Sequence, residues 1–321
     1  MKRFYALLLI CSLILTHFSG CSKNKDQQND VKQVAFITNN TSDFWQFARR
    51  GCEKAENQLQ EISVNFRLTS DATSAEQRRI IDDLLAKGVQ AIAISPIDPA
   101  NQKPFIDQLS QQIPVITCDS DIPNSQRLCY LGTDNIAAGR QAGELVKEVL
   151  PKGGKIMLFV GKKDSQNAKE RIEGIRQAIE DTDIEIIDIR TDNTDQVRAK
   201  SNVSDALVKY PDLACCVGLW NYNGPAILNA VTDAGKLGQV EIVCFDEDQE
   251  TLIGVRDGHI HGTVVQQPFE FGYQSINILA DILKGDKSAI PSDRKIIIPT
   301  LVIKQEKSAD FLNRIDQLLK K

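Results

Sequence analysis

Two polar side chains, Asp246 and Gln266, each follow a short apolar run within residues 240–268. The runs 242–245 and 260–265 have the composition of β-strands, and a helical turn separates them. In an open parallel sheet, ligands bind at the carboxyl ends of the strands. A carboxylate accepts hydrogen bonds, and an amide both donates and accepts them, so the pair predicts a polar ligand site. The alternative is that Asp246 only caps the helix that follows it.

The elements that would position these two residues alternate along the chain from Val31 onward. The β-rich runs that we predict as strands are 34–37, 62–68, 91–94, 114–118, 128–131, 155–160, 184–189, 213–219, 241–245 and 260–265. The predicted helices are 44–59, 74–87, one that Pro104 opens, 135–150, 165–180, 196–209, 225–234 and a turn around 252–255. This alternation is typical of parallel sheets with helices on both faces. The number of strands favours an α/β fold of two doubly wound lobes with a cleft between them.

The N-terminus has the pattern of an export signal. Lys2 and Arg3 precede an apolar run, residues 4–16, which is too short for a membrane-spanning helix. The junction Ser19-Gly20-Cys21 resembles a lipoprotein signal, so we expect residues 1–20 to be removed and Cys21 to carry a lipid. Residues 21–30 are polar and suit a tether between anchor and fold. The alternative is an ordinary secretory signal with a chance cysteine.

The charge of the chain argues against nucleic-acid binding. The formal net charge is −5, and without Lys2 and Arg3 it becomes −7. The remaining length of about 300 residues exceeds one comfortable core and favours two domains.

The cysteines and histidines predict no metal or redox centre. Outside Cys11 and Cys21, the six cysteines form no CxxC pair and no cluster with histidine. His259 and His261 alternate on one predicted strand without a third ligand. A loop separates Cys118 from Cys129, and the sequence is compatible with either a disulfide between them or two buried thiols. Buried thiols suit the other cysteines that lie inside apolar strands, Cys215, Cys216 and Cys244.

Several short motifs together resemble those of one known family. They are Thr41-Ser42-Asp43-Phe44-Trp45, Pro114-Val115-Ile116-Thr117-Cys118-Asp119, Gly132-Thr133-Asp134-Asn135, Lys169-Glu170-Arg171-Ile172-Glu173-Gly174, Tyr210-Pro211-Asp212-Leu213 and Phe245-Asp246. The chain resembles a periplasmic sugar-binding protein of the ribose-binding type, the receptor of an ABC importer. The resemblance covers residues 31–304.

This resemblance implies two α/β lobes joined by three hinge strands, with a sugar between them. The first lobe would take residues 31–133 plus 268–294, and the second 134–267 plus 295–321. The crossings would fall at Thr133 and Asp134, at Gln267 and near residues 295–299. The resemblance further implies a monomer in the periplasm or cell envelope, anchored through Cys21, that needs no cofactor and delivers a neutral sugar to an ABC permease in the membrane.

The resemblance also assigns ligand contacts by position. Those residues are Phe44, Trp45, Asp119, Asn167, Arg171, Trp220, Asn221, Asp246 and Gln266. Aromatic rings stack on the C–H faces of a sugar, and carboxylate, amide and guanidinium groups bind its hydroxyls. Two departures favour another neutral sugar or a polyol over ribose: Ser120 replaces an arginine of ribose binders, and Trp220 or Asn221 stands where they carry an asparagine.

Other interpretations of the same residues remain at this point. Phe44 and Trp45 also fit the core of the first helix, and Arg171 also fits a solvated ion pair with Glu170 or Glu173. A sensory receptor that presents sugar to a membrane kinase or chemoreceptor shares the fold. A repressor on this fold needs a helix-turn-helix where the signal peptide lies. An enzyme is not expected, because the sequence has no G-x-S-x-G elbow, no P-loop and no Cys/His pairing.

Overall fold

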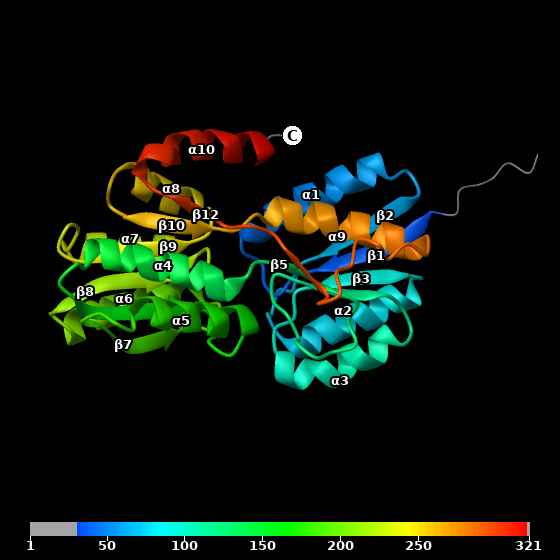
Figure 1. Cartoon of the computed structure of the whole chain (residues 1–321), viewed down its shortest axis with the longest axis horizontal. Coiled ribbons are helices and arrows are strands. Elements are labelled where there is room, and N and C mark those ends of the chain that lie inside the picture. The colour runs from blue at the N-terminus through cyan, green and yellow to red at the C-terminus, as the bar shows by residue number, and fades with distance from the viewer. Residues whose placement is uncertain (1–30, 320–321) are drawn as a thin grey trace, which may run out of the picture. The chain divides into compact units, whose positions relative to one another are not determined.

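The computed structural model describes residues 31–319, which form two α/β lobes (Figure 1). The first sheet has the strand order β11-β5-β4-β3-β1-β2, and the second has the order β12-β10-β9-β8-β6-β7. Neighbouring strands run parallel, apart from the antiparallel pair of β10 and β12. The predicted pair of doubly wound lobes is therefore confirmed. The predicted signal peptide and the lipidated Cys21 lie outside the described residues.

The first lobe buries both faces of its sheet. Its strands are β1 (Lys32–Ile37), β2 (Ile62–Arg67), β3 (Ala91–Ile94), β4 (Val115–Cys118), β5 (Tyr130–Gly132) and β11 (Lys295–Ile297). Its helices are α1 (Phe44–Gln58), α2 (Ser74–Ala86), α3 (Pro99–Ser110) and α9 (Pro268–Leu283). Successive side chains of a strand point to opposite faces, so Val34 and Phe36 pack with α1 and α9 while Ala35 and Ile37 pack with α2 and α3.

The second lobe repeats this arrangement. Its strands are β6 (Gly154–Val160), β7 (Ile184–Thr191), β8 (Leu213–Gly218), β9 (Glu241–Phe245), β10 (Gly262–Val265) and β12 (Leu301–Ile303). Its helices are α4 (Asn135–Val149), α5 (Gln166–Ile179), α6 (Gln196–Lys209), α7 (Asn223–Asp233) and α8 (Gln249–Arg256). Helices α4 and α5 pack on the face with Ile156 and Leu158, and α6 and α7 on the face with Met157 and Phe159.

Glycines bring two pairs of helices into backbone contact. A Cβ atom on Gly51 of α1 would lie 2.0 Å from the carbonyl oxygen of Phe269 in α9, and one on Gly139 of α4 would lie 2.3 Å from the carbonyl oxygen of Arg171 in α5. Any larger residue at these positions would push the helices apart. The position of Arg171 therefore depends on Gly139.

The chain crosses between the sheets three times: after β5, after β10 and between β11 and β12. Hydrogen bonds tie the crossings together. Thr133 Oγ1 donates to Gln266 Oε1 at 2.9 Å, and Gln267 Nε2 donates to the Pro299 carbonyl at 2.9 Å. Strand β11 pairs with β5 of the first sheet, although we expected residues from 295 onward in the second lobe. The third crossing therefore lies at residues 298–300.

The structure corrects the predicted start of one helix and decides between the two alternatives for Cys118 and Cys129. Helix α3 begins at Pro99 and not at Pro104, because the side chain of Asp98 accepts a hydrogen bond from the Asn101 N–H and caps the helix there. Cys118 and Cys129 form no disulfide: both are free thiols buried in the first core, as is Cys52.

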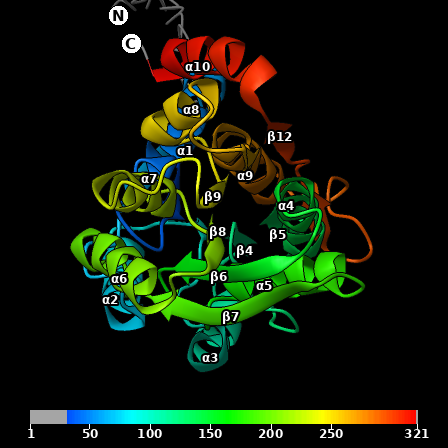
Figure 2. The same ribbon diagram turned by 90° about the vertical axis from the view of Figure 1, so that its left-hand side faces the viewer.

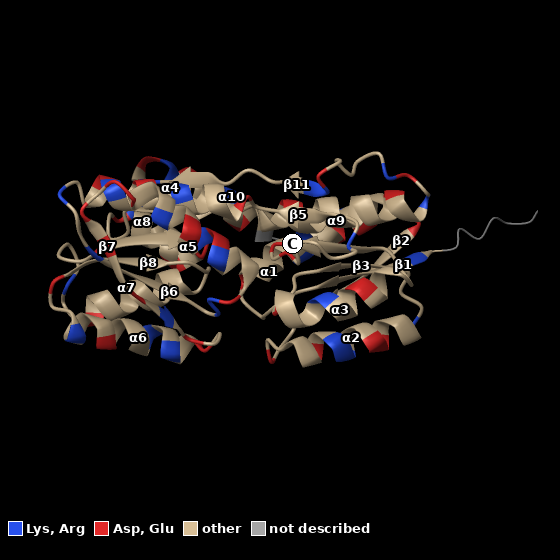
Figure 3. Cartoon of the chain, turned by 60° about the horizontal axis from the view of Figure 1, so that its bottom comes forward, with Lys and Arg blue, Asp and Glu red and all other residues tan. Residues whose placement is uncertain are grey.

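The last helix, α10 (Gln305–Leu319), lies on the side of the fold away from α3 (Figure 1, Figure 2). It packs against α8 of the second lobe and also touches α1 of the first. No helix within residues 31–319 is both long and apolar enough to cross a membrane. Basic and acidic residues are intermixed along α2 and α6 (Figure 3).

Candidate functional site

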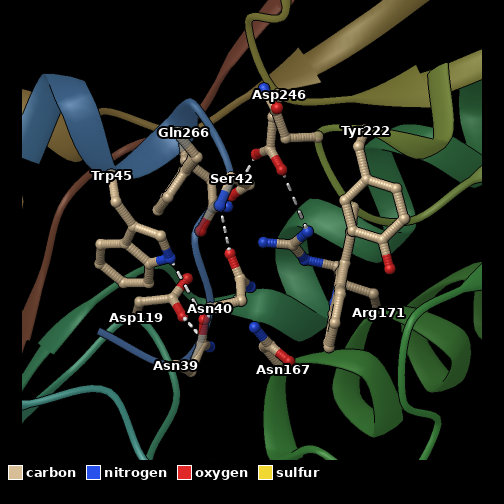
Figure 4. Close-up of a pocket in the computed structure, with 13 residues that line it drawn as sticks. Asn39, Asn40, Ser42, Trp45, Asp119, Asn167, Arg171, Tyr222, Asp246 and Gln266 are labelled. Atoms are coloured by element: carbon tan, nitrogen blue, oxygen red, sulfur yellow. Dashed lines mark hydrogen bonds and ion pairs between the residues drawn. The ribbon is translucent and has the colours of Figure 1, made fainter. Parts of the chain in front are cut away.

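A cavity with about 320 Å³ of empty space lies at the carboxyl ends of strands from both sheets (Figure 4). All nine predicted ligand contacts line it, and the structure adds Asn39, Asn40, Ser42 and Tyr222. The nine are Phe44, Trp45, Asp119, Asn167, Arg171, Trp220, Asn221, Asp246 and Gln266. The two sheets thus bring residues that lie up to 227 positions apart, from Asn39 to Gln266, to one place.

Two carboxylates occupy equivalent positions in the two lobes. Asp119 directly follows β4 and Asp246 directly follows β9, which are the third strands in their sheets. Both have a left-handed backbone, with φ of 62° and 70°, and each donates its N–H to the neighbouring strand. Asp246 does not cap α8: that role belongs to Asp248, whose side chain accepts from the N–H groups of Glu250 and Thr251. The capping interpretation is therefore wrong.

Asp119 lies in a network of first-lobe amides and hydroxyls. Its Oδ2 accepts hydrogen bonds from Ser95 Oγ at 2.8 Å and from Asn39 Nδ2 at 3.3 Å. The other end of the Asn39 amide accepts from Trp45 Nε1 at 3.2 Å. Burial, together with the charge of Asp246, raises the pKa of Asp119 to about 6, although Arg171 and Ser95 act in the opposite direction. This carboxyl therefore changes its charge near neutral pH.

Arg171 is a buried cation of the cavity wall. Its side chain is 1% exposed, and the guanidinium lies 4.4 Å from the centroid of the Phe245 ring. Nε donates to Asn135 Oδ1 at 3.0 Å and Nη1 to the Leu219 carbonyl at 2.5 Å. The alternative of a solvated pair with Glu170 or Glu173 is therefore wrong.

Asp246 and Gln266 form the second polar wall. Gln266 Nε2 donates to Asp246 Oδ1 at 2.7 Å, which orients the carboxylate. Arg171 Nη1 lies 3.8 Å from Asp246 Oδ2, a distance of electrostatic attraction without a direct hydrogen bond. Burial raises the pKa of Asp246, and the Arg171 charge opposes that shift. The Oδ2 atom is therefore the side of Asp246 that faces the guanidinium.

Three nitrogen donors of the second lobe have no hydrogen-bond partner within residues 31–319. They are Arg171 Nη2, Trp220 Nε1 and Asn221 Nδ2, and each is buried. A buried donor without an acceptor costs about 1–3 kcal/mol of stability, so such groups require an explanation. All three residues line the same cavity, which is therefore equipped to bind a ligand with several acceptor oxygens.

Aromatic rings from both lobes enclose the polar groups. Phe44 and Trp45 meet edge to face, with centroids 5.0 Å apart, and Trp220 and Tyr222 do so at 6.4 Å. Tyr222 is held by a 2.6 Å hydrogen bond from its hydroxyl to Asp192. Phe44 and Trp45 also belong to the first core, so the two rings pack in the core and line the cavity at the same time.

The additional lining residues were recognisable in part. Asn39 and Asn40 follow β1 at the same sheet edge that predicted Asp246, and Ser42 lies within the motif that contains Phe44. Tyr222 directly follows the predicted Trp220 and Asn221, but the hydrogen bond from its hydroxyl to Asp192, 30 residues earlier, could not be seen in the sequence.

Metal ligation is not supported in the described part of the chain. Residues 31–319 contain no group of three His, Cys, Asp or Glu side chains that could hold a metal ion. The His261 ring lies 2.7 Å from a carboxylate oxygen of Glu148, and neither of these two residues lines the cavity.

Comparison with known proteins identifies relatives over nearly the whole chain. The family described as periplasmic binding protein domain matches residues 34–287. The ribose import binding protein of Salmonella typhimurium is 25% identical over 301 residues, covering 93% of this chain and 99% of that protein. An ABC transporter solute-binding protein from Burkholderia graminis, solved with D-arabinose, has a TM-score of 0.81 and 27% identity, over 87% of this chain and 97% of that one. A solved complex of XylFII with LytSN has a TM-score of 0.79 and 27% identity, over 86% and 98%.

Proposed function

Since the chain belongs to the periplasmic binding protein family, we propose that its cavity captures a neutral sugar and that the protein delivers this sugar to an ABC import permease. The family consists of solute-binding proteins, which confirms the prediction that the chain is not an enzyme. The observation that carries the proposal is the set of three unpaired donors facing two buried carboxylates in one cavity.

A sugar matches this set of groups in both polarity and shape. Each hydroxyl both donates and accepts, so it can give its proton to Asp119 or Asp246 and accept from Arg171 Nη2 or Asn221 Nδ2. The faces of the ring carry C–H groups, which stack on Trp45 or on the aromatic wall opposite. In a buried site, a ligand without these hydroxyls leaves the protein groups unpaired and is rejected. We assign all nine predicted residues to ligand contact on this basis.

The charges of the cavity favour a neutral ligand. Two carboxylates face a single guanidinium, so an acidic sugar would add a third negative charge to a buried site. Similar proteins bind ribose and D-arabinose according to their names, which supports a monosaccharide of that size. Ser120 replaces the arginine of the ribose-binding type, and on this ground we favour another neutral sugar or a polyol.

Capture would involve closure of the two lobes about the three crossings. Besides the cavity, the lobes touch at a rim where Lys162 Nζ donates to the Ala72 carbonyl at 2.5 Å. A ligand that contacts both lobes favours the state in which they meet. Small-angle scattering of the sugar-bound and sugar-free protein measures this: the radius of gyration should be smaller with sugar.

We further propose that the mature protein is attached to the membrane through a lipid on Cys21. The support is the Ser19-Gly20-Cys21 junction and the polar residues 21–30 that would separate the anchor from the fold. Palmitate labelling of wild type and Cys21→Ala tests this, and equal labelling of the two would contradict it.

A panel of pentoses, hexoses, polyols and sugar acids, measured by thermal shift and then by titration calorimetry, tests the proposed ligand. A neutral sugar should raise the melting temperature, because a ligand that binds only the folded state stabilises it. Binding of sugar acids alone, or of none of the sugars, would overturn the proposal.

The alternative is a sugar sensor that signals through a membrane kinase or chemoreceptor. The solved complex of XylFII with LytSN favours it, because a similar receptor there binds a second protein. Affinity capture with the membrane proteins encoded beside the gene separates the two functions: a permease supports import, and a kinase or chemoreceptor supports sensing.

A further inference from the structure

A second cavity lies beside the second crossing, and Gln266 lines both cavities. It has about 750 Å³ of empty space, part of it open to solvent. Its walls come from α1 and α9 of the first lobe and from β12 and α10 at the end of the chain. Of the residues that line this second cavity, only Gln266 also lines the first.

The carboxyl group of Glu247, in the wall of this cavity, has no hydrogen-bond partner among residues 31–319. Glu247 is 2% exposed, and neither of its carboxyl oxygens accepts a hydrogen bond from the described residues. The preceding residue, Asp246, lines the other cavity, so consecutive residues serve different sites. Burial and the charge of Asp246 raise the pKa of Glu247 well above its usual range. Nothing in sugar capture explains a buried carboxyl at this position.

Aromatic rings accompany the carboxyl. Phe47, Phe269 and Phe311 line the same cavity, and their electron-rich faces attract cations. Lys54 Nζ already lies 5.5 Å from the centroid of Phe269, which shows that this ring accepts a positive charge. The other charged residues of the wall are less enclosed than Glu247: Lys54 and Arg314 are exposed and Glu270 is half-buried. Their charges are therefore screened by water, whereas a negative charge that Glu247 gains on ionisation would not be.

We propose that this cavity is a second binding site, which takes a small organic ammonium ion with an apolar body. When the bound cation stabilises the ionised form of Glu247, an ammonium group with up to three N–H donors can satisfy both oxygens, whereas an alcohol has only one donor. The phenyl rings add an attraction for the positive charge, and Leu301 and Ile315 cover the apolar body. The site is independent of sugar capture and goes beyond it.

The test uses benzylammonium as the probe and benzyl alcohol as its uncharged counterpart of the same shape. Both are titrated at neutral pH into the ¹⁵N-labelled protein, with amide shifts as the readout. Benzylammonium should bind saturably, with the largest shifts near Phe47, Glu247 and Phe311, and should bind about tenfold more tightly than the alcohol. Saturating amounts of the confirmed sugar should not displace it.

Two variants locate the binding. Glu247→Gln keeps the shape of the side chain and should weaken benzylammonium binding at least about tenfold. Phe311→Ala removes one ring and should weaken it as well; it serves as the decisive variant if Glu247→Gln does not fold. The proposal is overturned by absence of binding to the wild type, by equal binding of the alcohol, by displacement with sugar, or by wild-type affinity in the folded variant.

Discussion

Sugar affinity should fall as the pH drops through 6, and Asp119 is the reason. A sugar hydroxyl that donates to this carboxyl needs its ionised form, and burial holds the pKa of Asp119 at about 6. With that pKa, the ionised fraction falls from nearly all at pH 7.5 to about one tenth at pH 5, which corresponds to an affinity loss of about tenfold, or 1.4 kcal/mol. Asp246 acts in the same direction, because its pKa is also raised.

Asp119 changes the free energy of unfolding with pH in the opposite direction to its effect on sugar affinity. The folded-state pKa of Asp119 lies above the ordinary aspartate pKa of 3.8, so the folded protein binds more protons between the two values. The contribution of this group to the free energy of unfolding therefore rises as the pH falls through that window. A loss of binding near pH 5 through Asp119 is thus separable from a loss of structure.

Titration calorimetry between pH 7.5 and pH 5 measures the affinity, and circular dichroism at each pH monitors the fold. Asp119→Asn provides the matched control, because asparagine keeps the shape and tolerates the left-handed backbone but does not titrate. It should bind more weakly at pH 7.5 and lose part of the pH dependence. A wild-type affinity that stays constant down to pH 5, or an Asp119→Asn variant with the full wild-type slope, would refute the reasoning.

Three further predictions concern other parts of the fold. Trp45→Ala should weaken sugar binding by about 2–4 kcal/mol in titration calorimetry, while Trp45→Phe keeps a stacking face and should bind better than Trp45→Ala; equal affinities of both variants and wild type would contradict the assignment. Asp121→Ala leaves the buried Arg127 without its partner, so the free energy of unfolding in urea should fall by about 3–5 kcal/mol. Asp121 does not line the cavity, so sugar affinity should stay at the wild-type value, and a large change there would count against the map of the site. In mature Cys21→Ala protein, a thiol reagent should find no reactive cysteine in the native state and six in urea, because all six thiols are buried; four in urea would indicate a disulfide between Cys118 and Cys129.

The positions of the two cavity-lining carboxylates could be predicted because the carboxyl edge of a parallel sheet is a property of the strand pattern. Asp119 and Asp246 each end an apolar run, and the sequence shows where such runs end. The pairing of Arg171 was not predictable in this way. Its partners Asn135 and Leu219 lie 36 and 48 residues away. The packing of α4 against α5 brings Asn135 to Arg171, and the carboxyl end of β8 supplies the Leu219 carbonyl.

The sequence indicated least about β11, the start of α3 and Glu247. Strand β11 has three residues and joins the first sheet only through its contact with β5, which no local pattern indicates. The start of α3 was misplaced because two prolines compete for it, and the side chain of Asp98 decides in favour of Pro99. Glu247 attracted no attention in the sequence, since an acidic residue in a loop is ordinary until its burial is known.

The left-handed backbone at Asp119 and Asp246 affects how mutational scans of such receptors should be interpreted. Alanine in that conformation costs roughly 1–2 kcal/mol through contact of its Cβ with the following carbonyl, whereas asparagine adopts it readily. An alanine scan of stability would therefore assign to both carboxylates a loss that belongs partly to the main chain. Libraries that aim to change the sugar should vary these two positions among Asp, Asn and Gly, and place their full diversity at Trp220 and Asn221, which have no left-handed backbone to preserve.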